Sequence, residues 1–216
     1  MSTFNHLFEK ALLDNHIRLN DQARQKLIQY LELIKTWNRV FNLTSITDAR
    51  EMVYLHLIDS LAVMPFLHGK RLLDVGSGAG LPGIPLAITN PDQQWVLLDK
   101  NNKKTRFLTQ AIAELGLTNA QAIHSRCEDF QPAQRFDSIL SRAFGTIQMF
   151  AETTRHLLCP DGKLIAMKGK YPEDELNAIP DYYVAQDITR LDIQGITIER
   201  HIVRLTRNTG CQPALA

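Results

Sequence analysis

The sequence predicts an α/β protein in which a helical segment precedes a mostly parallel sheet of seven strands. Three observations support this prediction. After residue 70, short apolar runs of strand length alternate with longer amphipathic stretches. The first of these runs leads directly into a glycine-rich turn, GSGAG. Before residue 69, apolar residues instead recur at three- and four-residue steps, which is the spacing of helices.

Two helices are expected in the first third of the chain. Over residues 21–42, Leu27, Leu31 and Ile34 belong to one apolar stripe of an amphipathic helix. Asp48 and Glu51 form a capping-box-like pair ahead of MVYLHLIDSLAVMPFL, which predicts a second helix ending near residues 68–69. We therefore expect residues 1–68 to form an N-terminal helical extension or cap, and residues 69–216 to form the larger domain.

The larger domain contains five strand-like runs, at residues 72–76, 95–99, 121–125, 136–141 and 163–169. Helical patterns lie between them: KKTRFLTQAIAELG, closed by Gly116, and GTIQMFAETTRHLLCPDG, stopped by Pro160 and Gly162. Strands alternating with helices pair in parallel through right-handed crossovers. Residues 181–192 and 196–207 look like two consecutive strands with only Gly195 and its neighbours between them, which predicts an antiparallel hairpin at the sheet edge.

Composition narrows the class of protein. The chain has 216 residues, 44% of them hydrophobic, which is enough for one substantial core. A formal charge of +1 argues against a uniformly basic nucleic-acid-binding chain but allows a basic face. Three scattered cysteines without a CxxC or a Cys/His cluster predict reduced thiols and no metal site. The start does not resemble a signal peptide and no apolar run is long enough for a membrane span, so we expect a soluble, cytoplasmic protein.

The stretch LLDVGSGAGLPGIP has the features of a ligand-binding turn. In open α/β sheets, ligands bind beyond the carboxyl ends of the strands. Gly76, Gly78 and Gly80 lack side chains that would keep a ligand away from the backbone. Pro82 and Pro85 fall in the first turn of the following helix, where a missing amide hydrogen costs little.

The spacing of this turn favours S-adenosylmethionine over a dinucleotide. The GxGxxG fingerprint would need glycine at position 81, which is Leu81. Asp99 ends the second strand-like run, where a carboxylate can accept both hydroxyls of a ribose. No lysine stands beside the glycines in the sequence to bind phosphates. A tight turn with a surface aspartate remains the alternative.

Taken together, the motifs resemble the glucose-inhibited division protein B family, bacterial methyltransferases that modify N7 of one guanine in 16S ribosomal RNA. The resemblance covers nearly the whole chain. Its segments are WNRVFNLTSI, HLIDS, LLDVGSGAGLPGIPLAI, LLDKNNKKTRFL, SRCEDF, FDSILSRAF, MKG, PEDE and ERHIV. It implies a class I S-adenosylmethionine-dependent methyltransferase fold, which is Rossmann-like. It also implies a partner, 16S ribosomal RNA in the small subunit or its assembly intermediate, and we expect a monomer.

The resemblance also implies which residues contact S-adenosylmethionine. The family's contacts fall on Gly76, Leu81, Cys127, Glu128 and Arg142, and class I methyltransferases generally add Asp74 and Asp99. Cys127 would then be a small wall of the site, not a nucleophile. Without the resemblance, Glu128 reads more readily as a helix N-terminal charge in a solvated loop.

Guanine N7 has a lone pair and no proton, so we nominate no general base for the reaction. The substrate-binding candidates are Phe144, Lys168, Arg200 and His201. For Phe144 the sequence favours a place in the core over stacking on the substrate, and Arg142 could form a salt bridge at the end of its strand. His56 and His201 are interpreted as hydrogen-bonding structural histidines.

The polar residues Asn42, Thr44, His56 and Asp59 match polar positions of the family and either order a lid over the cofactor or tie the helices to the sheet. Lysines after the second strand, Lys100, Lys103 and Lys104, could bind RNA phosphates. Two other functions stay open: a methyltransferase of the same fold that acts on a small molecule or a protein, and a non-catalytic cofactor-binding module.

Overall fold

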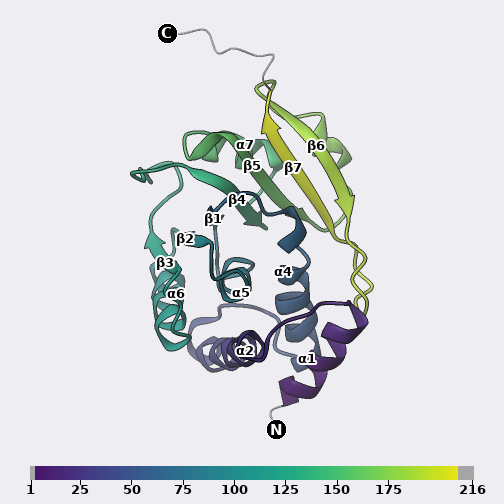
Figure 1. Ribbon diagram of the computed structural model, residues 1–216. Helices are drawn as coiled ribbons and strands as arrows, with labels where there is room; N and C mark the ends of the chain where they lie inside the picture. Colours follow the sequence, from purple (N-terminus) through teal and green to yellow (C-terminus); the bar gives the residue numbers. More distant parts are fainter. Residues whose placement is uncertain (1–2, 209–216) are drawn as a thin grey trace.

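A seven-stranded sheet forms the centre of the computed structural model, which describes residues 3–208 (Figure 1). The strand order is β3-β2-β1-β4-β5-β7-β6. Strands β1 to β5 are parallel, whereas β7 is antiparallel to both β5 and β6. The predicted fold class is confirmed. The strands are β1 (Arg71–Val75), β2 (Gln94–Asp99), β3 (Ala120–His124), β4 (Phe136–Arg142), β5 (Leu158–Lys168), β6 (Tyr183–Arg190) and β7 (His201–Arg207).

Side chains alternate between the two faces of the sheet, and each face has its own apolar core. Leu72 and Leu97 belong to one core, which includes residues of α5 (Gly83–Thr89) and α6 (Asn102–Glu114). Leu73 and Val96 belong to the other core, which includes residues of α7 (Ile147–Thr154). The short helix α8 (Glu173–Leu176) follows β5. Both faces of the strands are therefore covered, as parallel sheets require.

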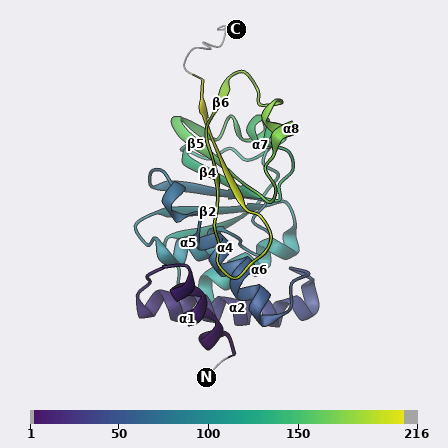
Figure 2. The ribbon, with the colours of Figure 1, turned by 90° about the vertical axis from the view of Figure 1, so that its right-hand side faces the viewer.

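The N-terminal helices lie below the sheet in Figure 2 and share the first of these cores. Leu27, Leu31 and Ile34 are buried on α2, and the Asp48 side chain accepts a hydrogen bond from the Glu51 amide, so the predicted stripe and cap are confirmed. A domain boundary at residue 68 stays a prediction. The elements are α1 (Thr3–Asp14), α2 (Asp21–Phe41), α3 (Ala49–Met52), the π-helical η1 (Val53–Ile58), α4 (Asp59–Leu61) and the 3₁₀ turn η2 (Met64–Phe66).

Two expected helices differ from the structure. The second N-terminal helix contains the π-helical segment η1, and π-helical turns occur frequently at functional sites. The helix expected to reach Pro160 ends at Thr154, and after a short turn β5 begins at Leu158. Pro160 is tolerated there because the pairing of β4 with β5 shifts register between Phe136 and Ser138, which leaves residues 159–162 out of the regular ladder.

The connection between β6 and β7 is longer than the sequence predicted. Strand β7 begins at His201, so residues 196–200 are not strand. The connection bonds to the N-terminal helices instead: the Asn15 side chain donates to the Gln194 carbonyl and accepts from the Gln194 amide, at 3.0 and 2.8 Å. Arg50 donates to the Gly195 carbonyl. These contacts tie the sheet edge to α1 and α3.

Candidate active site

Two adjoining cavities lie at the carboxyl ends of the parallel strands, where β1 stands between β2 and β4. At this point the connections change direction across the sheet, which is where α/β proteins bind ligands. The first cavity has a volume of about 380 Å³ and the second about 440 Å³. Ala143 and Phe144, just after β4, line both of them.

The glycines of the turn have different roles. Gly76, Gly78 and Gly80 all have positive φ, at 70°, 60° and 89°. Gly76 lines the first cavity, and a Cβ there would lie 3.0 Å from Cδ2 of Phe144. A Cβ on Gly80 would lie 2.6 Å from Cδ1 of Ile84, so Gly80 allows close packing of the turn on α5. Only Gly76 of the three borders the cavity.

Asp74 and Leu81 are buried beneath the turn and line neither cavity. The Oδ2 atom of Asp74 accepts a hydrogen bond from the Gly83 amide at 3.0 Å, while Oδ1 has no partner in the part of the chain that the structure describes. Burial raises the pKa of Asp74 to about 7, against the opposing effect of the Gly83 amide. This carboxyl group supports the turn from below.

Asp99 borders the first cavity at the end of β2. Its Oδ2 accepts from the Gly78 amide and its Oδ1 from the Asn101 amide, both at 2.8 Å. These two bonds fix the orientation of the carboxylate and connect it to the glycine turn. Although Asp99 is only 6% exposed, each of its oxygens retains a lone pair for a further donor, such as a ribose hydroxyl.

Cys127 and Glu128, which follow β3, also line the first cavity. Burial raises the pKa of the Cys127 thiol to about 12, and the charge of Glu128 acts in the same direction. A thiol that stays protonated is a poor nucleophile, which agrees with the interpretation of Cys127 as a wall. Glu128 is exposed and free to accept from a ligand.

The structure also places near the glycine turn a lysine that is distant from it in the sequence. Lys104 lies in the first turn of α6 and, with Lys100, lines the first cavity. Its Nζ lies 3.9 Å from the position that a Cβ on Gly78 would take. The expectation that no lysine stands near the glycines is therefore wrong. Strand β2 lies beside β1 and parallel to it, so the start of α6 after β2 lies close to the glycine turn after β1. The only sequence signal was its place just after Asp99.

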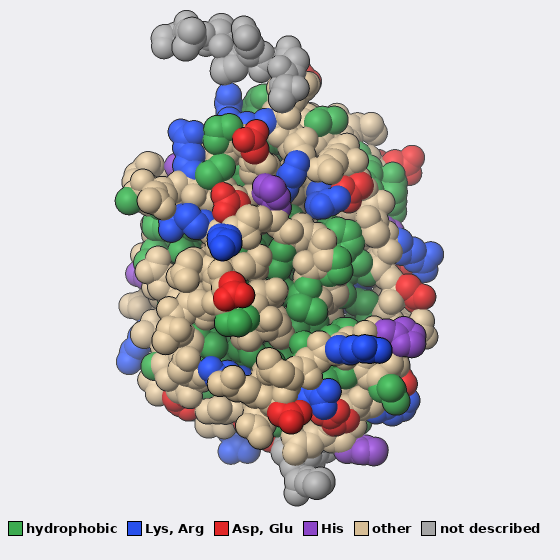
Figure 3. All heavy atoms as spheres, in the orientation of Figure 1, with side chains coloured by type: hydrophobic (Ala, Val, Ile, Leu, Met, Phe, Trp, Pro, Cys, Tyr) green, Lys and Arg blue, Asp and Glu red, His purple; other side chains and the backbone are tan. Residues whose placement is uncertain are grey.

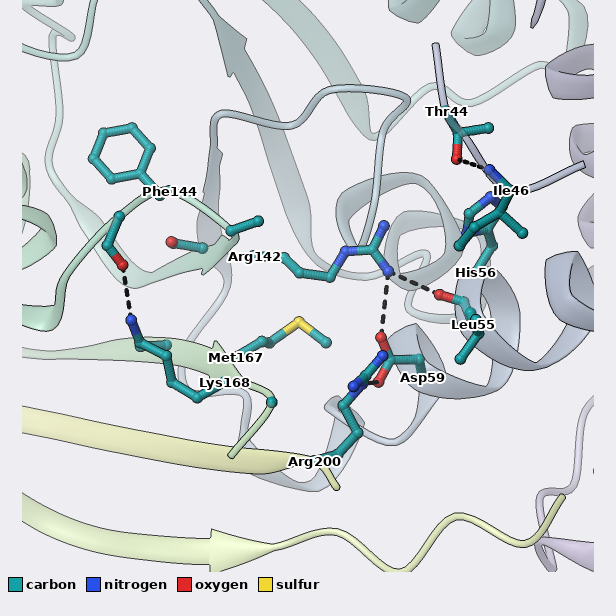
Figure 4. Close-up of a pocket in the computed structure, with 15 residues that line it drawn as sticks. Thr44, Ile46, Leu55, His56, Asp59, Arg142, Phe144, Met167, Lys168 and Arg200 are labelled. Carbon is teal, nitrogen blue, oxygen red and sulfur yellow. Dashed lines mark hydrogen bonds and ion pairs between the residues drawn. The ribbon is translucent and has the colours of Figure 1, made fainter. Parts of the chain in front are cut away.

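A buried carboxylate joins two arginines beside the second cavity (Figure 4). Asp59 is 1% exposed, and its Oδ2 lies 3.3 Å from Nη1 of Arg142 while its Oδ1 accepts from Nε of Arg200 at 2.8 Å. Arg142 also donates to the Leu55 carbonyl at 2.9 Å. The salt bridge that the sequence left open for Arg142 is thus present, and the same residue lines the cavity.

Three of the four substrate-binding candidates line the second cavity: Phe144, Lys168 and Arg200. Lys168 pairs with Glu175 at 2.7 Å and donates to the Gly145 carbonyl at 2.7 Å. His201 is buried outside both cavities, where its Nδ1 bonds to the Gly169 carbonyl.

The N-terminal polar residues also reach the second cavity. Thr44, His56 and Asp59 line it, and Asn42 lines neither of the two cavities. Burial, assisted by the charge of Arg142 and opposed by the Leu55 carbonyl, lowers the pKa of His56 to about 4. The ring is therefore neutral at physiological pH.

Charge on the visible surface is mixed. Figure 3 shows basic side chains dispersed among acidic ones on the face turned to the reader. Across residues 3–208, no helix combines the length and the apolar character needed to cross a membrane. Within the same described range, no group of three or more His, Cys, Asp or Glu side chains is arranged to hold a metal ion.

Comparison with known proteins identifies the family. A family model described as rRNA small subunit methyltransferase G matches residues 23–203. This chain belongs to that family. It is 48% identical over 179 residues to Ribosomal RNA small subunit methyltransferase G of Laribacter hongkongensis, covering 83% of this chain and 86% of the relative. Its identity to the Nitrosococcus oceani protein of the same name is 45% over 200 residues, with 93% and 94% coverage.

Membership of the rRNA small subunit methyltransferase G family confirms the predicted resemblance, the methyltransferase activity and S-adenosylmethionine as the cofactor. Solved structures show the fold. A SAM dependent methyltransferase from Aquifex aeolicus matches with a TM-score of 0.55 and 15% identity, over 72% of this chain and 92% of that one. TrmN from Thermus thermophilus matches with a TM-score of 0.55 and 17% identity, over 79% and 53%.

Proposed function

We propose that this protein transfers the methyl group of S-adenosylmethionine to N7 of one guanine in 16S ribosomal RNA, within the small subunit or one of its assembly intermediates. The main structural support is the pair of cavities that meet at Ala143 and Phe144. The first cavity offers a bare backbone turn and carboxylates to a nucleoside. The second cavity gives another ligand access to the place where the two cavities meet. The names of the relatives supply the substrate class.

The first cavity fits the cofactor. Gly76 brings bare backbone to the wall of the cavity, and Asp99 is held in place by two amides to accept ribose hydroxyls. We assign Glu128 to the adenine amino group and the backbone of Cys127 to the ring edge. S-adenosylmethionine supplies a methyl group that its sulfonium sulfur has already activated. These residues therefore bind and orient, and they transfer no proton.

The second cavity fits an acceptor that needs no general base. Guanine N7 presents an in-plane lone pair without a proton. Among the polar groups of this cavity, the Asp59 carboxylate is committed to Arg142 and Arg200. The contribution of the chain is then to align the base with the methyl group and to exclude water. Phe144 borders both cavities and is positioned to contact the base near the transferred methyl.

A ribosomal substrate also bears on the oligomeric state of the protein, its location in the cell and its contacts with RNA. Neither cavity needs a residue from another chain, so we propose that the protein acts as a monomer. A ribosomal substrate would place its work in the cytoplasm. Lys100, Lys103 and Lys104 would contact phosphates near the first cavity, and the shape of the subunit would supply much of the selectivity.

The test uses tritiated S-adenosylmethionine and small ribosomal subunits from cells that lack this enzyme. After incubation with the purified protein, the RNA is digested and the labelled nucleoside identified. We expect 7-methylguanosine at one site, and we expect Asp99→Ala to remove both the label and the measurable cofactor binding. An unlabelled RNA in the presence of wild-type protein that binds the cofactor would refute the proposal.

A further inference from the structure

His56 is a buried polar side chain whose ring nitrogens form no well-aligned hydrogen bond with the described residues. It lies in the π-helical segment η1 and is 1% exposed. A neutral imidazole has one donor and one acceptor. Buried polar groups of native proteins are nearly always paired, so each unpaired one requires an explanation.

The polar neighbours of His56 are already committed to each other. The Leu55 carbonyl accepts from Arg142, and the Asp59 carboxylate accepts from Arg142 and Arg200. His56 nevertheless lines the second cavity together with these groups. A carbonyl oxygen has two lone pairs, and the Leu55 carbonyl already opposes the fall of the His56 pKa, so it can take the one N–H of the ring. The acceptor nitrogen of the ring has no donor among these groups and is left for a donor that the cavity binds.

The order of the lining residues along the cavity gives an orientation for the acceptor base. Figure 4 shows Phe144 and His56 at opposite ends of the group of lining residues, with Arg142 between them. Phe144 also borders the first cavity, so the reacting atom belongs at that end. In guanine, N7 and the N–H groups of the Watson–Crick edge lie on opposite sides of the ring system. A base with N7 near Phe144 therefore presents its N–H edge toward His56.

We propose that neutral His56 accepts a hydrogen bond from an N–H group on the Watson–Crick edge of the target guanine. This proposal rests on the proposed function and adds a substrate-contacting residue to it. Ile46, on the connection between α2 and α3, lines the same cavity as His56. Because neighbouring atoms cover both ring nitrogens, the base can reach them only if side chains around His56 shift.

The contact would strengthen as the reaction proceeds. N7 uses its lone pair to bond the methyl carbon, the carbon–sulfur bond breaks, and its electron pair stays on sulfur. Positive charge thereby moves onto the base, whose N–H groups become more acidic and donate more strongly. A neutral acceptor stabilises this change in the transition state, whereas another cation at position 56 would oppose it.

The test compares three variants in single-turnover methylation of small subunits from cells lacking the enzyme, with cofactor affinity measured by calorimetry. His56→Phe fills the site without an acceptor, and His56→Gln restores one. Leu57→Val is the matched control, because Leu57 is fully buried in the same π-helical segment but lines neither cavity. We expect His56→Phe to lower the methylation rate by about 10- to 100-fold with cofactor affinity changed by less than about twofold. His56→Gln should lie between His56→Phe and wild type, and Leu57→Val should stay close to wild type.

Three outcomes would overturn the proposal. His56→Phe could methylate at the wild-type rate, or Leu57→Val could lose as much methylation rate as His56→Phe. In the third outcome, the cofactor affinity of His56→Phe falls by the same factor as its methylation rate. The last outcome would assign His56 to the cofactor. The wild-type protein separates these results from failure of the proposed function, because that failure would show as no 7-methylguanosine with any form of the protein.

Discussion

The two cavities differ in how the chain builds them. Residues of the first lie at the ends of β1, β2 and β4, after β3, and in the adjacent helices α6 and α7. The second draws on residues from the N-terminal helices, the ends of β4 and β5, and Arg200 before β7. The first is bounded by bare backbone and by charged side chains that include buried Asp99 and exposed Glu128, and none of its lining charges forms an ion pair among the described residues. The second depends on a buried carboxylate between two cations. Changes of charge should therefore cost folding stability at the second cavity and ligand affinity at the first.

The largest expected effect is that of Asp59→Ala. Removing this carboxylate leaves Arg142 and Arg200, each less than one third exposed, facing each other without a counter-charge. We expect a loss of about 4 kcal/mol in the free energy of unfolding, measured by urea titration. Asp187→Ala is the control, because its pair with Arg204 is more exposed and should contribute about 1 kcal/mol or less. Similar losses in the two variants would contradict the distinction.

Asp74→Asn tests the buried carboxyl beneath the first cavity. The folded-state pKa of about 7 lies above the ordinary 3.8, so the folded protein holds this proton more tightly than the unfolded chain. The resulting stability is present below pH 3.8 and is lost as the pH rises through 7. Between pH 5 and pH 8 the free energy of unfolding of the wild type, measured by urea titration, should fall by about 2 kcal/mol relative to that of Asp74→Asn. The side-chain oxygen of the asparagine can still accept from the Gly83 amide. Parallel stability curves for the two proteins would contradict this prediction.

His56 should give the opposite pH dependence at the second cavity. Its folded-state pKa of about 4 lies below the ordinary 6.5, so the unfolded chain binds the proton more tightly. Stability is then unaffected above pH 6.5 and falls as the pH decreases toward 4. Between pH 7 and pH 5 the free energy of unfolding of the wild type, measured by denaturant titration, should fall by about 2 kcal/mol relative to that of His56→Phe. A constant difference across this range would show that His56 is not held neutral.

Gly76→Ala should have a smaller effect on folding and act mainly on ligand binding. Its positive φ of 70° and the 3.0 Å approach to Phe144 mean that a methyl group would strain the turn and intrude beside the cavity. We expect a loss of about 1 kcal/mol in stability and at least about tenfold in S-adenosylmethionine affinity. Gly116→Ala is the matched control, since it shares a positive φ but has open space around it. It should lose stability with unchanged affinity, and an equal loss of affinity would contradict the role of Gly76.

Some features of this protein can be predicted from local sequence because short-range physics determines them. Alternating strand and helix patterns predicted the seven strands, and the capping residue Asp48 marked its helix. The glycine turn and Asp99 lie near each other in the sequence, on adjacent strands, and the structure joins them through the Gly78 amide. The first cavity could thus be anticipated from one motif and the strand after it.

Tertiary packing decided the rest. Residues 55–59, 142 and 200 are far apart in the sequence, and no periodicity indicates that Asp59 lies between Arg142 and Arg200. The π-helical segment, the register shift that admits Pro160 into β5, and the ten-residue connection before β7 all depend on contacts with distant elements. Burial, which gives Asp74 and His56 their unusual pKa values, arises only when those elements close around them.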